Sequence, residues 1–66
     1  MVSDAVITRV LEYLRDHHDG YVDDLLNLDG VNQEVIGFLK PFVINISDNN
    51  RYHVRSLGKI YIKFVL

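Results

Sequence analysis

Cysteine is absent from the 66 residues, so disulfide bonds and thiolate zinc sites are excluded. Long apolar runs are absent too: the longest, residues 42–44 and 64–66, are far shorter than the ~20 residues of a membrane-spanning helix. The first residues, MVSD, have neither the basic start nor the apolar stretch of a signal peptide. We therefore expect an intracellular protein, in the cytoplasm or nucleus, without a membrane partner.

The small size of the chain limits its function. At 66 residues it is expected to form one domain, which buries only about 60% of its unfolded surface and has little room for a deep pocket. An apolar content of 48% is nevertheless enough for a core. No nucleophile stands beside a base, so we expect no enzyme activity, no cofactor and no small-molecule substrate. Because the final residues, 64–66, are apolar, we expect these 66 residues to be one domain of a longer protein.

A helix is predicted over residues 3–18, where apolar side chains recur at three- and four-residue spacing and charged ones fill the other side. Ser3 is suited to cap its start, and Gly20 to supply the left-handed residue that often follows a helix. Residues 21–22 are both of β-forming type and are expected to form a stub strand.

Two shorter helices, joined by an Asp-Gly turn, are predicted next and together form a helix-turn-helix. The first covers residues 24–28 and is capped by Asp23. The second covers residues 33–40 and is capped by Asn32. Pro41 ends it, because proline disfavours helical geometry at the residue before it.

The rest of the chain is predicted to form a small antiparallel sheet. Residues 42–46 and 51–55 alternate in polarity around a Ser-Asp-Asn-Asn turn and are expected to form a β-hairpin. After a break at residues 56–58, residues 60–66 alternate again and are expected to form a last strand, whose pairing stays open. The fold class is therefore α+β, with three helices and a small antiparallel sheet whose hairpin is a wing.

Three stretches carry a family resemblance: residues 6–11 (VITRVL), 24–26 (DLL) and 42–44 (FVI). In their order and spacing they resemble winged helix-turn-helix domains. More narrowly they resemble the amino-terminal winged helix of zinc-finger antiviral proteins and their poly(ADP-ribose) polymerase relatives, over about residues 4–55. LOTUS and Z-nucleic-acid-binding domains share a similar plan. The resemblance implies a winged helix associated with RNA or, as in LOTUS domains, docked on a protein. It transfers no binding residue, because the antiviral family binds RNA largely through zinc fingers.

The net charge of −2 and the pI near 5.8 lack the basic character typical of a nucleic-acid-binding domain, but the charges are unevenly spread. Residues 1–39 hold two basic residues against eight acids, a balance of −6. Residues 40–66 hold five basic residues against one acid, a balance of +4. An anionic partner is therefore expected to contact the second half, whereas the acidic first half favours a basic protein.

The second half contains candidate nucleic-acid contacts in an alternating pattern, and these are Arg51, His53, Arg55, Lys59, Tyr61 and Lys63. Alternation along a strand directs each set of three to one face of the sheet. Paired strands would then offer a basic face for phosphates, with Tyr61 exposed to stack on a base. The simpler interpretation is the solvated outer face that any half-buried antiparallel sheet must have.

Two other motifs favour structural roles. The third predicted helix has one cation, Lys40, and an acidic Glu34, which disfavours base reading in the major groove of DNA. The run at residues 17–19 (HHD) directs its side chains apart on a helix, so a role at the helix end is favoured over a metal site. We expect no bound metal.

Two functions stay open at this point. The first is a nucleic-acid-associated module that uses the basic residues above, with RNA favoured over DNA by the resemblance. The second is a protein-docking or dimerisation module, which an open strand edge and exposed apolar positions such as Leu57 and Val65 would mark. A purely architectural domain that orients its neighbours is a third possibility.

Overall fold

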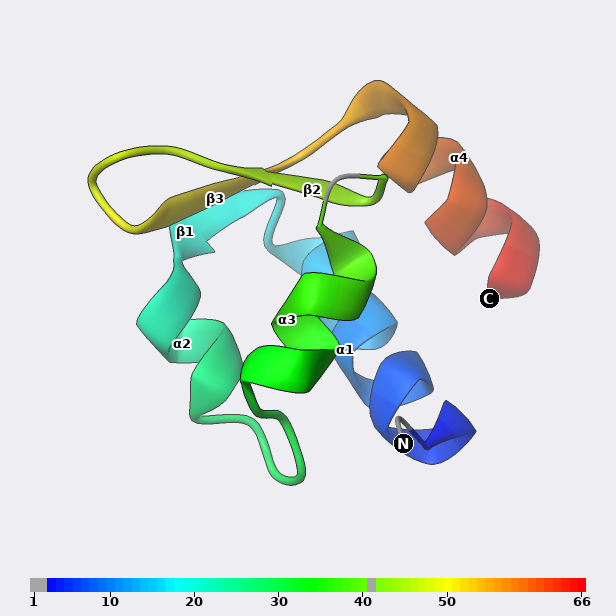
Figure 1. The fold of residues 1–66 in the computed structure, drawn as a ribbon. Coiled ribbons are helices and arrows are strands. Elements are labelled where there is room, and N and C mark those ends of the chain that lie inside the picture. Colours follow the sequence, from blue (N-terminus) through cyan, green and yellow to red (C-terminus); the bar gives the residue numbers. More distant parts are fainter. Residues whose placement is uncertain (1–2, 41) are drawn as a thin grey trace.

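The computed structural model describes residues 3–40 and 42–66, which form an α+β domain of four helices and a three-stranded antiparallel sheet (Figure 1). The elements in chain order are α1 (Asp4–Asp16), β1 (Asp19–Tyr21), α2 (Val22–Leu26), α3 (Gln33–Leu39), β2 (Ile44–Ile46), β3 (Arg51–Val54) and α4 (Ser56–Val65). No helix within the described residues has the length and hydropathy that are needed to cross a bilayer.

Helix α1 begins as predicted, because the Ser3 hydroxyl accepts a hydrogen bond of 3.2 Å from the amide of Ala5. Its apolar stripe is buried in the core. The expectation for Gly20 was wrong: the helix ends at Asp16, and Gly20 lies in β1 opposite Tyr52. A side chain at position 20 would meet the Tyr52 ring at 2.9 Å, so glycine is required there by close packing rather than by a left-handed backbone.

Helix α2 starts earlier than predicted, at Val22, and Asp23 does not cap it. Val22 is buried, and its amide donates a hydrogen bond to the carbonyl oxygen of Asn50 in the turn between β2 and β3. Core packing and this contact with the turn therefore determine where the helix starts. Helix α3 confirms the prediction, since the Asn32 side chain accepts a hydrogen bond of 3.2 Å from Val35. Lys40 has extended backbone geometry and ends the helix, while Pro41 lies outside the described residues.

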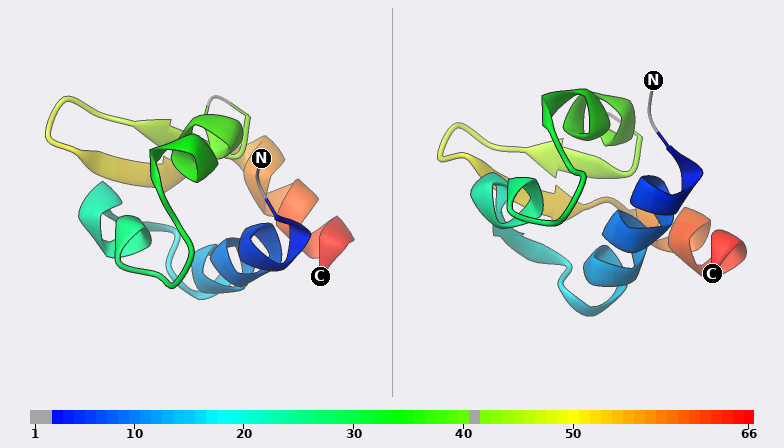
Figure 2. Two further views of the ribbon diagram at one scale, coloured as in Figure 1. Left: turned by 60° about the horizontal axis from the view of Figure 1, so that its bottom comes forward. Right: turned by 90° about the horizontal axis from the view of Figure 1, so that it is seen from below.

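Strand β3 is the centre of the sheet, with β1 and β2 on either side. Gly20 pairs with Tyr52 on one edge, and Asn45 pairs with His53 on the other. The predicted hairpin is present, although its first strand covers only Ile44–Ile46. Helices α1, α2 and α3 lie on one side of the sheet (Figures 1 and 2), where Tyr52 and Val54 join the buried leucines of the helices in the core.

The predicted last strand, residues 60–66, is wrong: residues 60–65 belong to helix α4, Leu66 follows as its C-cap, and the expected break at 56–58 is its first turn. Burial follows the helical period, with Gly58 and Ile62 buried one turn apart. Gly58 lies so close to the backbone of Val43 that a Cβ atom would be only 2.9 Å from the carbonyl carbon of Val43. The segment is rich in β-branched residues, which favour a strand. The close approach at Gly58 and the packing of α4 against α1 nevertheless make it a helix.

Candidate nucleic-acid interface

The outer face of the sheet displays two of the predicted contacts. Arg51 and His53 are exposed, while Tyr52 and Val54, which alternate with them, are buried, so the predicted alternation along β3 is confirmed. Arg55 is also exposed, but it lies beyond the strand as the residue that precedes α4. A shallow hollow of about 310 Å³ on this face is lined in part by Arg51, His53 and Asn45.

Both exposed β3 side chains contact strand β1. The Arg51 guanidinium lies over the Tyr21 ring, 5.0 Å from its centroid, which orients the cation without neutralising it. His53 donates from Nδ1 to a carboxylate oxygen of Asp19 at 2.5 Å. An acidic group from the first half of the chain therefore engages one of the predicted contacts, while Arg51 keeps its positive charge beside an aromatic ring.

The Asp19 carboxylate lies among several basic groups. The hydrogen bond from His53 holds the pKa of Asp19 below its usual value of 3.8, and the charges of His53, Arg51 and His18 act in the same direction. His18 directly precedes Asp19, and its carbonyl oxygen accepts a hydrogen bond of 2.8 Å from the amide of Val54, so it lies beside the central strand β3.

The predicted grouping of Lys59, Tyr61 and Lys63 was wrong, because it assumed a strand. In helix α4, Lys59 and Lys63 are one turn apart and lie on the same side of the helix. Tyr61 is half-buried, packs against the core and meets the Phe42 ring edge-on at a centroid distance of 6.2 Å. Tyr61 is therefore not the exposed stacking residue that the alternating pattern predicted.

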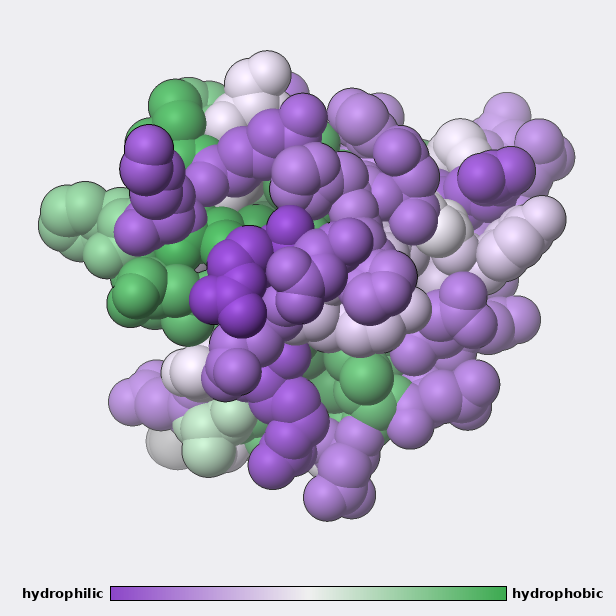
Figure 3. All heavy atoms as spheres, turned by 180° about the vertical axis from the view of Figure 1, so that it is seen from behind, coloured by the Kyte–Doolittle hydropathy of each residue, from purple (hydrophilic) through white to green (hydrophobic). Residues whose placement is uncertain are grey.

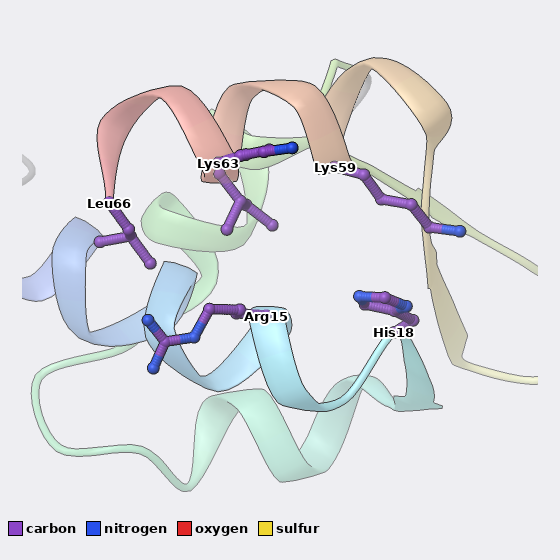
Figure 4. A pocket seen from close by; sticks show the side chains of 6 residues that line it. Arg15, His18, Lys59, Lys63 and Leu66 are labelled. Carbon is purple, nitrogen blue, oxygen red and sulfur yellow. The ribbon is translucent and has the colours of Figure 1, made fainter.

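The two α4 lysines instead face the end of α1 across a hollow of about 330 Å³ (Figure 4). Ile62 and Leu66 supply apolar lining, and Arg15 and His18 from the α1 side contribute two further basic side chains. Among the described residues that line this hollow, none is acidic. The hollow therefore combines an apolar surface with four groups that can carry positive charge.

Arg15 and His18 were missed from the sequence. The sequence pattern predicted Arg15 on the solvent side of the first helix. In the structure its guanidinium is exposed and lies 3.8 Å from the exposed Asp16 carboxylate. His17 has the predicted helix-end role, since it donates to the Tyr13 carbonyl at 3.0 Å and stacks on the Tyr13 ring. His18 turns to the hollow instead. No local signal marks either residue, because the hollow exists only once α4 packs beside α1.

Helix α3 offers little for base recognition. Gln33 and Lys40 are exposed, and the Asn32 side chain caps the helix as predicted. The apolar side chain of Phe38 is 59% exposed on this helix. Within residues 3–40 and 42–66, no group of three or more histidine or acidic side chains is positioned to hold a metal ion.

Comparisons with protein-family models, with curated proteins and with solved structures find no match for this chain.

Proposed function

We propose that this chain is a winged-helix module that binds the phosphate backbone of nucleic acid, preferably RNA, and that it is a binding module rather than an enzyme. The order helix, strand, helix, helix, strand, strand with β3 in the centre of the sheet supports the winged-helix assignment. The observation that carries the functional proposal is that the hollow between α1 and α4 is lined by four basic side chains, Arg15, His18, Lys59 and Lys63, and by no acidic one among the described residues.

The chemistry of the hollow suits phosphate groups. Lysine and arginine bind phosphate oxygens by charge-assisted hydrogen bonds, and the counterions released from the backbone add to the affinity. Such contacts do not depend on the base sequence of the nucleic acid. Helix α3 agrees with this mode of binding, because the Asn32 side chain is engaged in capping the helix and Lys40 at its end is its single cation. Arg51, exposed on the sheet face, adds a second positive region.

The proposal is tested by fluorescence anisotropy with labelled RNA and DNA oligonucleotides, single- and double-stranded, at low and then moderate salt. The expected dissociation constant is on the order of 10⁻⁴ to 10⁻⁶ M and increases steeply with salt. The double variant Lys59→Glu, Lys63→Glu should abolish binding, because it reverses the charge on one wall of the hollow. Arg51→Glu with Arg55→Glu should weaken it.

The control is Lys40→Glu, which reverses the charge of one lysine that does not line the hollow, half the charge change of the double variant. It should retain most of the affinity. Absence of binding at low salt would overturn the proposal. A larger loss for Lys40→Glu than for the α4 pair would also overturn it, since that result would place the nucleic acid on α3.

A further inference from the structure

Helix α4 exposes large apolar side chains on the side away from its contacts with the domain. Phe64 is 89% exposed, Ile60 65% and Leu57 55%. In the view from behind, apolar side chains gather at the edge of the molecule where α4 lies (Figure 3). Exposed apolar patches on soluble domains mark interaction sites.

Helical geometry makes these residues one continuous surface. Leu57, Ile60 and Phe64 follow the spacing i, i+3, i+7, which aligns them along one face of α4. The contact between Tyr61 and Phe42, which is itself 54% exposed, extends the apolar surface toward β2. The opposite side of α4, at Gly58 and Ile62, is already buried. A helix that is apolar on both sides is normally covered on both.

A stripe of positive charge runs along one border of this apolar surface. Lys59 and Lys63 directly precede Ile60 and Phe64, so each lysine lies about 100° around the helix from its apolar neighbour. A partner that covers Leu57, Ile60 and Phe64 must therefore run beside two cations. Its most favourable flank is acidic, because carboxylates would pair with both lysines at the rim.

We propose that the exposed face of α4 binds an amphipathic helix whose apolar stripe covers Leu57, Ile60 and Phe64 and whose acidic flank meets Lys59 and Lys63. A second copy of this chain fits less well. Residues 56–65 contain no acidic residue, so pairing α4 with itself would add two more lysines and no carboxylate. The apolar surface that carries this inference does not line the hollow, but Lys59 and Lys63 border both. Variants of Ile60 and Phe64 therefore separate it from nucleic-acid binding.

The test is a selection from displayed peptides of helical pattern, with apolar residues at i, i+3 and i+7 and randomised flanks. Peptides that bind should be enriched in Asp and Glu on one flank. Phe64→Ser and Ile60→Ser should each weaken a selected peptide by about tenfold. Phe38→Ser, which changes another exposed apolar residue on a different helix, should leave its affinity unchanged. Circular dichroism of each variant verifies that the fold is retained.

Two further measurements complete the test. Lys59→Glu with Lys63→Glu should shift the selection from acidic to basic flanks, and Phe64→Ser should leave oligonucleotide affinity unchanged. Selected peptides without an acidic bias, or without sensitivity to Phe64→Ser, would overturn the inference. The inference would also be overturned if sedimentation showed that the wild-type chain is a dimer and that Phe64→Ser dissociates it. The occupant of the apolar surface would then be a second copy of the chain.

Discussion

The hydroxyl of Tyr52, at the centre of the sheet, donates a hydrogen bond of 2.9 Å to the backbone carbonyl oxygen of His17 at the end of α1. The ring of Tyr52 is only 2% exposed and lies over Gly20 of β1. One side chain of β3 therefore links the end of the first helix and the first strand to the hairpin. It also helps to place His18, the next residue, at the hollow.

Removal of this hydroxyl should reduce stability. Tyr52→Phe keeps the buried ring but leaves the His17 carbonyl without this donor, at an expected cost of about 0.5–1.5 kcal/mol in the free energy of unfolding. Chemical denaturation measures the change. Tyr21→Phe, which alters an exposed tyrosine, should change the unfolding free energy by less than about 0.5 kcal/mol. Equal effects of the two substitutions would contradict the structural role of the hydroxyl.

Stability should fall at alkaline pH through the same residue. Burial raises the pKa of Tyr52 to about 12, with smaller contributions from Tyr13, Asp24 and Asp19, whereas the unfolded chain has the ordinary value of 10.0. This contribution is therefore fully present below pH 10 and is lost as the pH increases toward 12. Unfolding curves across that range should show a steeper loss for the wild type than for Tyr52→Phe. Parallel curves would contradict the prediction.

Gly58→Ala should destabilise the domain although it lies in a helix. The added methyl group would meet the Val43 backbone, with the carbonyl carbon only 2.9 Å away, so α4 must shift at a cost of about 1–3 kcal/mol. Gly37→Ala in α3 is the matched control, because nothing lies within 4 Å of its Cβ position. It should stabilise the domain by about 1 kcal/mol. Thermal unfolding of the pair gives opposite signs if α4 packs as described.

Acidification should remove the contribution of Asp19. Its pKa is lowered chiefly by the hydrogen bond from His53, so this contribution is present above pH 3.8 and is lost as the pH falls through the folded-state pKa. An NMR titration of the Asp19 side-chain carboxyl carbon should show a midpoint below 3.8. In His53→Gln the midpoint should move up toward that value. An unchanged midpoint would show that His53 does not hold the carboxylate.

Arg15 provides a test of the hollow that leaves the residues of α4 unchanged. If Arg15 contacts a phosphate, Arg15→Gln should reduce the slope of log K against log salt by about 0.7 for single-stranded RNA. Lys40→Gln removes a charge elsewhere and should leave the slope unchanged. The measurement is anisotropy over a series of salt concentrations. A reduced slope for Lys40→Gln alone would contradict the assignment of the hollow.

The sequence by itself determined the first helix, the capped third helix and the β-hairpin. In each of these a local rule suffices: Ser3 and Asn32 cap their helices through side-chain hydrogen bonds, and the alternation of Arg51 to Val54 agrees with burial. The order of these elements was also readable. These features depend on neighbours within a few residues along the chain.

Tertiary structure decided the rest. The final segment has apolar residues that satisfy both an alternating and a helical pattern, and it became a helix because Gly58 lets it approach Val43 while Ile62 enters the core. That choice moved Lys59 and Lys63 away from the sheet and across from Arg15 and His18. The basic hollow is thus formed by residues more than forty positions apart in the sequence. Only the packing of α4 beside α1 brings them together, and no local pattern encodes that contact.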